Sequence, residues 1–544
     1  MNTNAKEILK ALPVEHPRFG DTRGGQPVTF FESISAGLSS NGGLFMPEVL
    51  PRAFKNIPDF FTSVLPSLTI PEIATLVHRV FIPREDISDE ELSRMMEEAY
   101  NFEIPLEKLD THTYIARLDC GPTASFKDLA ARSIARLLDT WSEVHKKPLN
   151  IVVATSGDTG VAIADAFGKA RHITVTVMYP EGGVSEVQEK QMLRVQERNE
   201  NIQVIPVLGN FDNCQDISKI LQLTRELSEQ NKASIKEQVS YKLKQDISDT
   251  ELEKLSEDIK TLNLGSANSI NIWRLIPQMV QYFVSYAHLI KTGEITRGEA
   301  VCFAIPTGNV GHMMAGLFAE ELGLPISKFI IGTNTNNIMA NIIGSGVIRH
   351  KEFTNTSAPS MDILDPSNLE RLLYFAAQKT GHEEPIHYEQ MKKDIKNIAP
   401  FEDIPLSKYG VTREMLEYLQ QLIWSEDTET DDELYAMMSY QYQKNHIVLE
   451  PHGVSALIAT IRTREKKALA REATVVVFET AHPDKFPSSL RAAYLENATY
   501  RHHPELDALK KLRREDMHKP DVCAVDLIAI AHTIKKFTTK NTLV

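Results

Sequence analysis

The sequence is organised around the stretch Gly121-Pro122-Thr123-Ala124-Ser125-Phe126-Lys127-Asp128, which leads directly into a predicted helix. Apolar residues recur at helical spacing beyond it, and Asp128 falls in the first turn, where a carboxylate interacts favourably with the helix dipole. Lys127 would therefore stand at a helix N-terminus beside the apolar Phe126. Such a place favours the neutral amine that a Schiff-base lysine needs. The alternative is a surface lysine that happens to begin a helix.

Length and composition describe an ordinary globular protein. A chain of 544 residues predicts two or three domains, and 42% hydrophobic and 24% charged residues are typical of globular proteins that are not embedded in membranes. The net charge of -14 argues against nucleic acid or an anionic membrane as the main partner. The net charge does not exclude a local basic pocket for a small anionic substrate.

The cysteines and the N-terminus favour a cytoplasmic protein. Cys120, Cys214, Cys302 and Cys523 are far apart and lack metal-ligand spacing, so we expect free thiols, no metal site and no disulfide framework. Residues 1–13 lack the apolar core of a targeting segment, and no apolar run approaches membrane-spanning length.

Short apolar runs alternate with helical segments from residue 149 onward, which predicts βαβ units and a parallel sheet. The charged stretch 228–262 is interpreted as a solvated helical insertion, and 380–445 as mostly charged helix. The predicted strands are 149–154, 173–179, 202–207, 301–305, 329–332 and 473–478.

Three of these strands end in polar or glycine-bearing turns: 155–160, 307–311 and 479–483. The ends of parallel strands lie along one edge of a sheet, where open α/β folds bind ligands. Backbone N–H groups of 307–311 could cradle an anion at a helix N-terminus, and the hydroxyl-bearing turn 155–160 could hold a carboxylate. Both could instead be plain connections, with Ser156 and Asp158 as ordinary helix caps.

Two cradles and a lysine together suggest a phosphorylated aldehyde cofactor, pyridoxal 5'-phosphate. Lys127 would bind the aldehyde as a Schiff base, the glycine loop would bind the phosphate, and Thr480 could face the pyridine nitrogen. A hydroxyl at that place would leave the nitrogen uncharged.

Several motifs, in order along most of the chain, resemble the threonine synthase family, in its longer bacterial and fungal branch. The motifs are Ser40-Asn41-Gly42-Gly43-Leu44-Phe45-Met46-Pro47-Glu48, the stretch Gly121 to Asp128, Ala154-Thr155-Ser156-Gly157-Asp158-Thr159-Gly160, Gly265-Ser266-Ala267-Asn268-Ser269-Ile270-Asn271, Pro306 to Gly311, Met361-Asp362-Ile363, Pro366-Ser367-Asn368 and Thr480-Ala481-His482-Pro483.

The resemblance implies an α/β fold of the fold type II pyridoxal-phosphate (tryptophan-synthase-β-like) class, with two parallel-type α/β domains, the cofactor between them, an N-terminal segment and helical insertions. The expected parts are an N-terminal domain (1–110), a domain with the cofactor lysine and carboxylate loop (111–300), a domain with the cofactor-phosphate loop (301–500) and a helical tail (501–544).

The resemblance also implies conversion of O-phospho-L-homoserine and water to L-threonine and phosphate by γ-elimination and β-addition. Lys127 would be the cofactor lysine and would move protons at Cα and Cβ of the substrate. The remaining expected cofactor residues are Gly308, Asn309, Val310, Gly311, His312 and Thr480. The expected substrate residues are Ser156, Asp158, Thr159, Asn268, Ser269, Asn271 and Arg274, with Arg274 as candidate for the leaving phosphate or as a structural salt-bridge residue.

Three positions depart from the family pattern. Gly183 stands where members usually carry Lys or Arg, His312 where Asn or Asp is common, and Asn336-Asn337 replaces a usual Asn-Asp. The departure at Gly183 motivates a second hypothesis, a lyase that releases 2-oxobutyrate, ammonia and phosphate from the same substrate. A third hypothesis is a non-catalytic paralogue, against which the intact Lys127 argues. The family offers both monomers and homodimers.

Overall fold

The computed structural model describes residues 1–12, 16–225, 227–349, 351–399, 402–428, 430–518 and 520–542. The chain divides into two compact units. The first unit contains residues 1–33, 38–130 and 272–503, and the second contains 34–37, 131–271 and 504–544.

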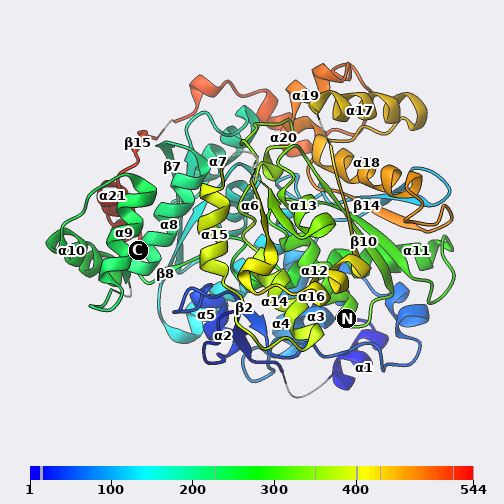
Figure 1. The fold of residues 1–544 in the computed structure, drawn as a ribbon, viewed down its shortest axis with the longest axis horizontal. Coiled ribbons are helices and arrows are strands. Elements are labelled where there is room, and N and C mark those ends of the chain that lie inside the picture. The colour runs from blue at the N-terminus through cyan, green and yellow to red at the C-terminus, as the bar shows by residue number, and fades with distance from the viewer. Residues whose placement is uncertain are drawn as a thin grey trace. The chain divides into compact units, whose positions relative to one another are not determined.

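A six-stranded sheet, counted over the described residues, forms the centre of the first unit (Figure 1). All neighbouring strands run parallel except the edge pair β3 and β4. The predicted strands at 301, 329 and 473 are confirmed, because their β-branched runs are buried on both faces. The order across the sheet is β13 (Ile423–Asp427), β10 (Ile326–Thr333), β9 (Val301–Pro306), β14 (Val475–Glu479), β4 (Thr113–Arg117) and β3 (Leu106–Lys108).

Helices cover this sheet, and α18 (Pro451–Glu465) packs across β9, β10 and β14. Two antiparallel strand pairs lie outside it: β1 (Phe19–Asp21) with β2 (Phe45–Pro47), and β11 (Val347–Arg349) with β12 (Asp403–Pro405). The other helices in the sequence of this unit are α1 (Thr3–Ala11), α3 (Ile70–Arg79), α4 (Asp89–Ala99), α11 (Met279–Thr292), α12 (Gly311–Glu321), α13 (Ile338–Ser345), α14 (Leu369–Thr380), α15 (Tyr388–Asn397), α16 (Arg413–Leu422), α17 (Asp431–Asn445) and α19 (Pro487–Ala492).

The second unit is built on a five-stranded sheet in which every pair of described neighbours is parallel. The predicted strands at 149, 173 and 202 are its three central strands. The order is β15 (Cys523–Ala524), β7 (Ile202–Leu208), β6 (Ile173–Pro180), β5 (Leu149–Ala154) and β8 (Leu264–Gly265). Its helices include α6 (Asp158–Phe167), α7 (Glu186–Arg198), α8 (Phe211–Arg225) and α20 (Pro504–Lys510), while α2 (Phe30–Ala36) and α5 (Lys127–His145) each have residues in both units.

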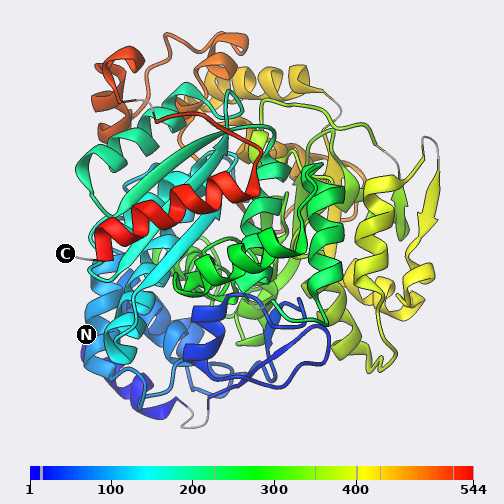
Figure 2. The ribbon, with the colours of Figure 1, turned by 90° about the vertical axis from the view of Figure 1, so that its left-hand side faces the viewer.

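The charged stretch 228–262 forms two helices, α9 (Lys232–Leu243) and α10 (Asp249–Lys260). Their leucines and isoleucines are buried in one core cluster with α8 and α21 (Leu527–Thr542), so only one side of the insertion is solvated. The helix α21, red in Figure 2, contacts α8, α10 and β6. Helix α21, which is distant in sequence from α8 and α10, thus completes the hydrophobic core of this unit.

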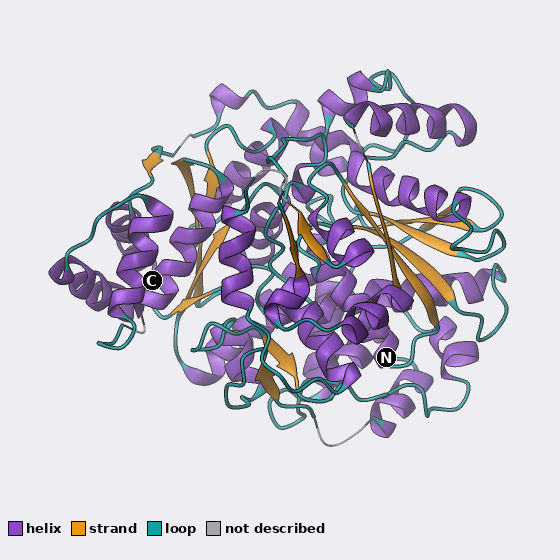
Figure 3. Ribbon diagram, viewed as in Figure 1, coloured by secondary structure: helices purple, strands orange, loops and turns teal. Residues whose placement is uncertain are grey.

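Helices and strands alternate from β5 to α8, whereas α8, α9 and α10 follow one another without a strand between them (Figure 3). Within the part of the chain that the structure describes, none of the helices combines the length and the apolar character needed to span a bilayer.

Candidate active site

The lysine-bearing stretch is fastened to the segment that follows β14. The backbone N–H of Phe126 donates to the carbonyl of Thr480 at 2.8 Å, and the N–H of His482 donates to the carbonyl of Ala124 at 3.0 Å. Ser125 and Ala481 form an antiparallel bridge between these two bonds. Lys127 is the first residue of α5, as predicted, and it therefore begins that helix beside the end of β14.

Asp128 holds the loop before the helix in shape. Its two carboxylate oxygens accept from the backbone N–H of Thr123 at 2.8 Å and from the hydroxyl of Thr123 at 2.6 Å. Gly121 packs so closely on this carboxylate that an added Cβ would lie 2.4 Å from Asp128 Oδ2. The loop conformation thus depends on a glycine and on a buried acid five residues after Thr123.

Lys127 is half-buried between an aromatic ring and a hydroxyl. Its Nζ lies 5.5 Å from the centre of the Phe126 ring and 3.5 Å from Oγ of Ser360. This environment differs from that of a surface lysine, because one side of the amine is apolar and the other offers a hydrogen-bond partner.

The turn between β9 and α12 has the geometry of an anion cradle. Val310 is the N-cap of α12 and adopts φ +65°, a left-handed conformation that is an outlier for a β-branched residue. Such strain persists where the surrounding structure imposes it and gathers at functional sites. At Gly308, an added Cβ would lie 2.8 Å from the carbonyl oxygen of Ser360, so only glycine fits there.

The motif 366–368 supports the same turn. The side-chain oxygen of Asn309 accepts from the backbone N–H of Ser367 at 3.0 Å, and Asn368 donates from its side chain to the carbonyl of Asn309 at 3.0 Å. Asn368 in turn accepts from Arg371, which is fully buried. These bonds hold the turn 308–311 and the motif 366–368 together, although the two are separated in sequence.

His312 links α12 to the lysine stretch through its ring. The imidazole stacks on Phe126 with ring centres 5.0 Å apart, and its Nε2 is hydrogen-bonded to the side-chain amide of Gln281. Burial lowers the pKa of His312 to about 3, so the ring is neutral near pH 7. His312 therefore adds no positive charge to the neighbouring turn 308–311.

Thr480 follows β14 and is hydrogen-bonded to a buried acid. Its hydroxyl donates to Oε1 of Glu450 at 3.2 Å. Glu450 is the N-cap of α18, where its side chain accepts from two backbone N–H groups. Lys127, the turn 308–311 and Thr480 thus all belong to the first unit. The turn follows β9, Thr480 follows its neighbour β14, and the stretch before Lys127 is hydrogen-bonded to the segment after β14.

Glu450 also connects back to Ser360 beside the lysine. Its Oε2 lies 2.5 Å from Nδ1 of His452, whose Nε2 accepts from the backbone N–H of Ser360 at 3.1 Å. Nothing in the local sequence singles out Ser360, Glu450 or His452. Glu450-Pro451 has the form of a helix cap with proline in the first turn, which carries no information about a contact with Ser360.

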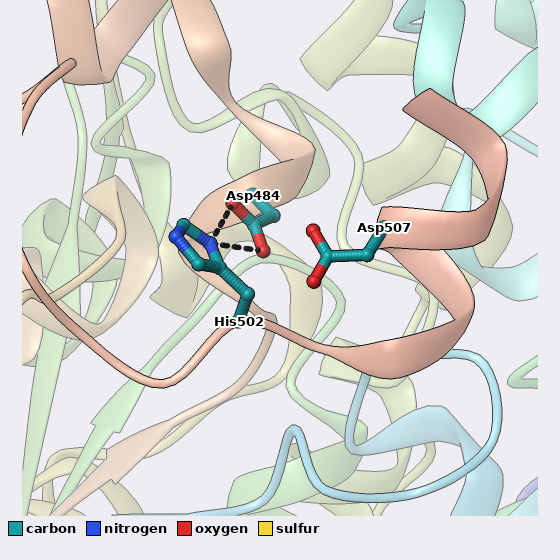
Figure 4. Close-up of side chains that lie close together, drawn as sticks. All are labelled: Asp484, His502 and Asp507. Atoms are coloured by element: carbon teal, nitrogen blue, oxygen red, sulfur yellow. Dashed lines mark hydrogen bonds and ion pairs between the residues drawn. The ribbon is translucent and has the colours of Figure 1, made fainter. Parts of the chain in front are cut away.

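Residues 500–503 brace the segment after Thr480. Tyr500 donates to Asp484 at 2.8 Å, and Nδ1 of His502 lies 3.1 Å from both oxygens of the same carboxylate (Figure 4). His503 Nε2 lies 3.0 Å from the carbonyl oxygen of Gly121. The start of the predicted tail therefore contacts both stretches that fix Lys127.

In the second unit, Thr155 organises the turn after β5. Its Oγ accepts from the backbone N–H groups of Gly157 at 2.9 Å and Gly160 at 2.8 Å. Ser156 and Thr159 are half-buried, and buried Asp158 accepts from the side chain of Gln188 at 2.9 Å. Since Thr155 accepts from these N–H groups and the N-cap Gly157 has no side-chain cap, Ser156 and Asp158 do not act as the ordinary caps that we considered.

The other expected substrate residues differ in exposure. Asn268 and Ser269 are half-buried, and Asn268 donates to the carbonyl of Ala154 at the end of β5 at 3.0 Å. Asn271 is fully buried and donates to the carbonyls of Ile34 and Ser266. Arg274 belongs to the first unit, is 4% exposed, and has its pKa lowered by burial to about 10.

Two of the unusual positions have a structural explanation. Gly183 ends a tight turn, and an added Cβ would lie 2.6 Å from Cγ of Pro180, so a longer side chain would require another backbone path. Asn337 donates from its amide to the carboxylate of Asp427. An aspartate at position 337 would bring two carboxylates together, which accounts for the asparagine.

Comparisons with known proteins show which family this chain resembles. A family model described as "Threonine synthase N terminus" matches residues 18–100, and one described as "Pyridoxal-phosphate dependent enzyme" matches residues 96–241. Threonine synthase of Schizosaccharomyces pombe is 30% identical over 504 residues, which cover 88% of this chain and 90% of that protein. Threonine synthase of Pseudomonas aeruginosa is 30% identical, with 88% of this chain and 91% of that protein covered.

Solved structures show the same similarity. The structure of pyridoxal-phosphate-bound threonine synthase from Brucella melitensis has a TM-score of 0.76 and 27% identity, covering 96% of this chain and 99% of that one. Threonine synthase from yeast has a TM-score of 0.76 and 26% identity, covering 97% and 100%. The predicted α/β fold of fold type II pyridoxal-phosphate enzymes is confirmed.

Proposed function

Because this chain belongs to the threonine synthase family, we propose that it converts O-phospho-L-homoserine and water to L-threonine and phosphate as a pyridoxal-phosphate-dependent lyase. The observation that carries the proposal lies within the first unit. The strained turn 308–311 and Thr480 follow the neighbouring strands β9 and β14, and the stretch that leads into Lys127 is hydrogen-bonded beside Thr480. An amine suits the aldehyde of this cofactor, an anion cradle suits its phosphate, and a polar side chain such as a hydroxyl suits its ring nitrogen.

The residues present fit pyridoxal 5'-phosphate. Gly308 leaves the backbone close to Ser360, and the left-handed Val310 precedes the first turn of α12, whose N–H groups suit a phosphate. When bound, the cofactor supplies an electron sink that stabilises negative charge at carbon atoms next to the amino group of an amino acid. Lys127 would hold its aldehyde, Gly308, Asn309, Val310 and Gly311 its phosphate, and Thr480 its ring nitrogen.

Lys127 is also the candidate proton carrier of the reaction. A half-buried amine with an apolar ring on one side and a hydroxyl on the other can accept protons from Cα and Cβ of the substrate, and can return protons at Cγ after phosphate leaves and at Cα. His312, neutral and stacked on Phe126, would hold this wall of the site in place without competing for the proton.

For the substrate we propose two sets of residues. Ser156, Asp158 and Thr159 belong to the turn that Thr155 orders, and its N–H and hydroxyl groups suit the substrate carboxylate. Asn268, Ser269 and Asn271 form the neighbouring motif, in which the half-buried Asn268 and Ser269 are the better placed to reach a ligand. Arg274 remains the candidate for the leaving phosphate, because a guanidinium binds phosphate bidentately.

The decisive experiment is incubation of the cofactor-loaded protein with O-phospho-L-homoserine, followed by measurement of threonine, phosphate, 2-oxobutyrate and ammonia. Threonine and phosphate in equal amounts support the proposal. Phosphate with 2-oxobutyrate and ammonia, but without threonine, would instead identify the lyase suggested by Gly183. Absence of any product would favour the non-catalytic paralogue.

A Lys127→Ala variant separates loss of chemistry from loss of fold. We expect it to lack the visible absorbance band of the unmodified protein and to release no phosphate, while its circular dichroism spectrum is unchanged. Retention of the band would reject Lys127 as the residue that takes up the aldehyde.

We propose further that the protein acts in the cytoplasm on a small-molecule substrate, as a monomer or homodimer, without nucleic-acid or membrane partners. Its net charge of -14 supports the last point, because polyanions and anionic lipids would be repelled. Light scattering after size-exclusion chromatography distinguishes monomer from dimer, and cell fractionation tests the location.

A further inference from the structure

Glu450 is surrounded by hydrogen-bond donors although it is fully buried. Its Oε2 accepts from the backbone N–H of His452 at 2.8 Å and faces Nδ1 of the same histidine at 2.5 Å. Its Oε1 accepts from the backbone N–H of Gly453 at 3.1 Å and from the hydroxyl of Thr480 at 3.2 Å. Four donors therefore converge on one carboxylate.

The direction of these bonds is set by Ser360. Nε2 of His452 accepts the backbone N–H of Ser360, so a neutral imidazole must carry its proton on Nδ1 and donate it to Glu450. With both oxygens already accepting from N–H groups, Glu450 is an acceptor toward Thr480 as well. A threonine hydroxyl has one proton, and here that proton points to Glu450.

A second buried acid, Glu479, stands beside the first. Its Oε1 accepts from the backbone N–H of Glu450 at 2.6 Å, and its Oε2 has no hydrogen-bond partner among the described residues. Burial, together with the neighbouring Glu450, raises the pKa of Glu479 well above its usual range. Glu479 thus favours its protonated form, whereas the four donors around Glu450 suit a carboxylate that accepts from all of them.

We propose that Glu450 is a positioning residue that turns the Thr480 hydroxyl away from the cofactor, so that Thr480 presents a lone pair to a protonated ring nitrogen. This inference rests on the proposed function, in which Thr480 is the partner of that nitrogen. It reverses the expectation from the sequence that a hydroxyl leaves the nitrogen uncharged. A pyridinium is the stronger electron sink, and the buried charge of Glu450 would stabilise it.

The test is nuclear magnetic resonance of the holoenzyme loaded with pyridoxal 5'-phosphate labelled with 15N in the ring. For the unmodified protein we expect a resonance at the pyridinium position. A resonance at the position of neutral pyridine in this protein would overturn the inference, and that measurement depends on no variant.

The Glu450→Gln variant should reverse the hydrogen bond. Two donors from His452, against one from the backbone of Gly453, hold the side-chain oxygen on the Oε2 side. The new amide NH2 would therefore face Thr480 and donate to its hydroxyl oxygen. The threonine proton is then free to point at the ring nitrogen, and the 15N resonance should move to the neutral position. An unchanged resonance would overturn the role of Glu450.

Glu479→Gln is the matched control, because Glu479 is equally buried and its Oε1 contacts the backbone of Glu450 rather than Thr480. We expect it to keep the pyridinium resonance, and a shift as large as that of Glu450→Gln would overturn the assignment to Glu450.

Should Glu450→Gln fail to fold, Thr480→Val removes the acceptor itself and should also abolish the pyridinium resonance. Failure of the proposed function looks different, since no cofactor would be bound or no threonine formed.

Discussion

The hydroxyl of Ser360 lies 3.5 Å from the amine of Lys127, although 233 residues separate them in the chain. The backbone N–H of Ser360 is anchored on His452 at 3.1 Å, which fixes the hydroxyl's place beside the amine. The lysine motif alone therefore does not define the surroundings of the amine. A second segment, held by α18, completes them.

We expect Ser360→Ala to lower kcat by up to about tenfold, because a hydrogen bond contributes about 0.5–1.5 kcal/mol. KM for O-phospho-L-homoserine should change little, since the backbone bond to His452 remains, and the pH profile of kcat should shift. Ser345→Ala, which removes an exposed hydroxyl bonded within α13, is the matched control. Equal kcat for both variants would show that the Ser360 hydroxyl plays no part.

Gly308→Ala should weaken cofactor binding about tenfold or more, because overpacking costs about 1–3 kcal/mol. The new methyl group would lie 2.8 Å from the carbonyl oxygen of Ser360 and would push the cradle out of shape. Fluorescence titration with pyridoxal 5'-phosphate measures the change. At Gly344 an added Cβ would approach only Ser425, at 3.9 Å, so Gly344→Ala should bind the cofactor normally.

Thr155→Val should raise KM for the substrate about tenfold through loss of hydrogen bonds to two backbone N–H groups, each bond being worth about 1 kcal/mol. Valine has nearly the shape of threonine but cannot accept from Gly157 and Gly160. Thr155→Ser keeps the acceptor and should keep KM. If the serine variant were as impaired as the valine variant, the effect would come from packing.

Asn337→Asp should destabilise the protein by about 1 kcal/mol, because a hydrogen bond between two half-buried side chains is replaced by a contact between like charges. The amide that donates to Asp427 becomes a second carboxylate facing it. The exchanged pair Asn337→Asp with Asp427→Asn restores one donor and one acceptor. Thermal unfolding should show recovery in the double variant, and additive losses would contradict the direct contact.

Glu370 should make stability depend on pH. It is fully buried and bonded to Thr22, Arg23 and Lys392, and although burial opposes it, these partners lower its pKa from 4.5 to about 2. A carboxyl group with a lowered folded pKa stabilises above the unfolded pKa, and this contribution is lost as the pH falls from 4.5 to about 2.

The loss corresponds to about 3 kcal/mol. The difference in free energy of unfolding between unmodified protein and Glu370→Gln should be largest above pH 4.5 and should shrink toward pH 2. Glu417→Gln is the control, because Glu417 pairs with Arg413 on an exposed helix face and its side chain is 50% exposed. A pH-independent difference for Glu370→Gln would refute the linkage.

Much of the fold was predictable from local sequence. Buried runs such as 149–154 and 301–305 have the composition of parallel strands, and glycine-bearing turns mark where helices begin after them. The start of α5 at Lys127 followed from the same kind of local signal. Charged stretches were harder, because the buried apolar residues of α9 and α10 belong to a core cluster that α21, distant in sequence, helps to form.

By itself, the sequence determined where an amine, an anion cradle and a hydroxyl stand along the chain, because strand ends and helix starts are set by residues within one or two turns of each other. Only the tertiary structure decided what surrounds them. The partners of Lys127 and Thr480, namely Ser360 and Glu450, come from segments far along the chain, and hydrogen bonds between buried groups carry no periodic signal. The direction of these hydrogen bonds follows from burial and from the number of nearby donors. Both are present only when the distant segments pack together in the folded protein.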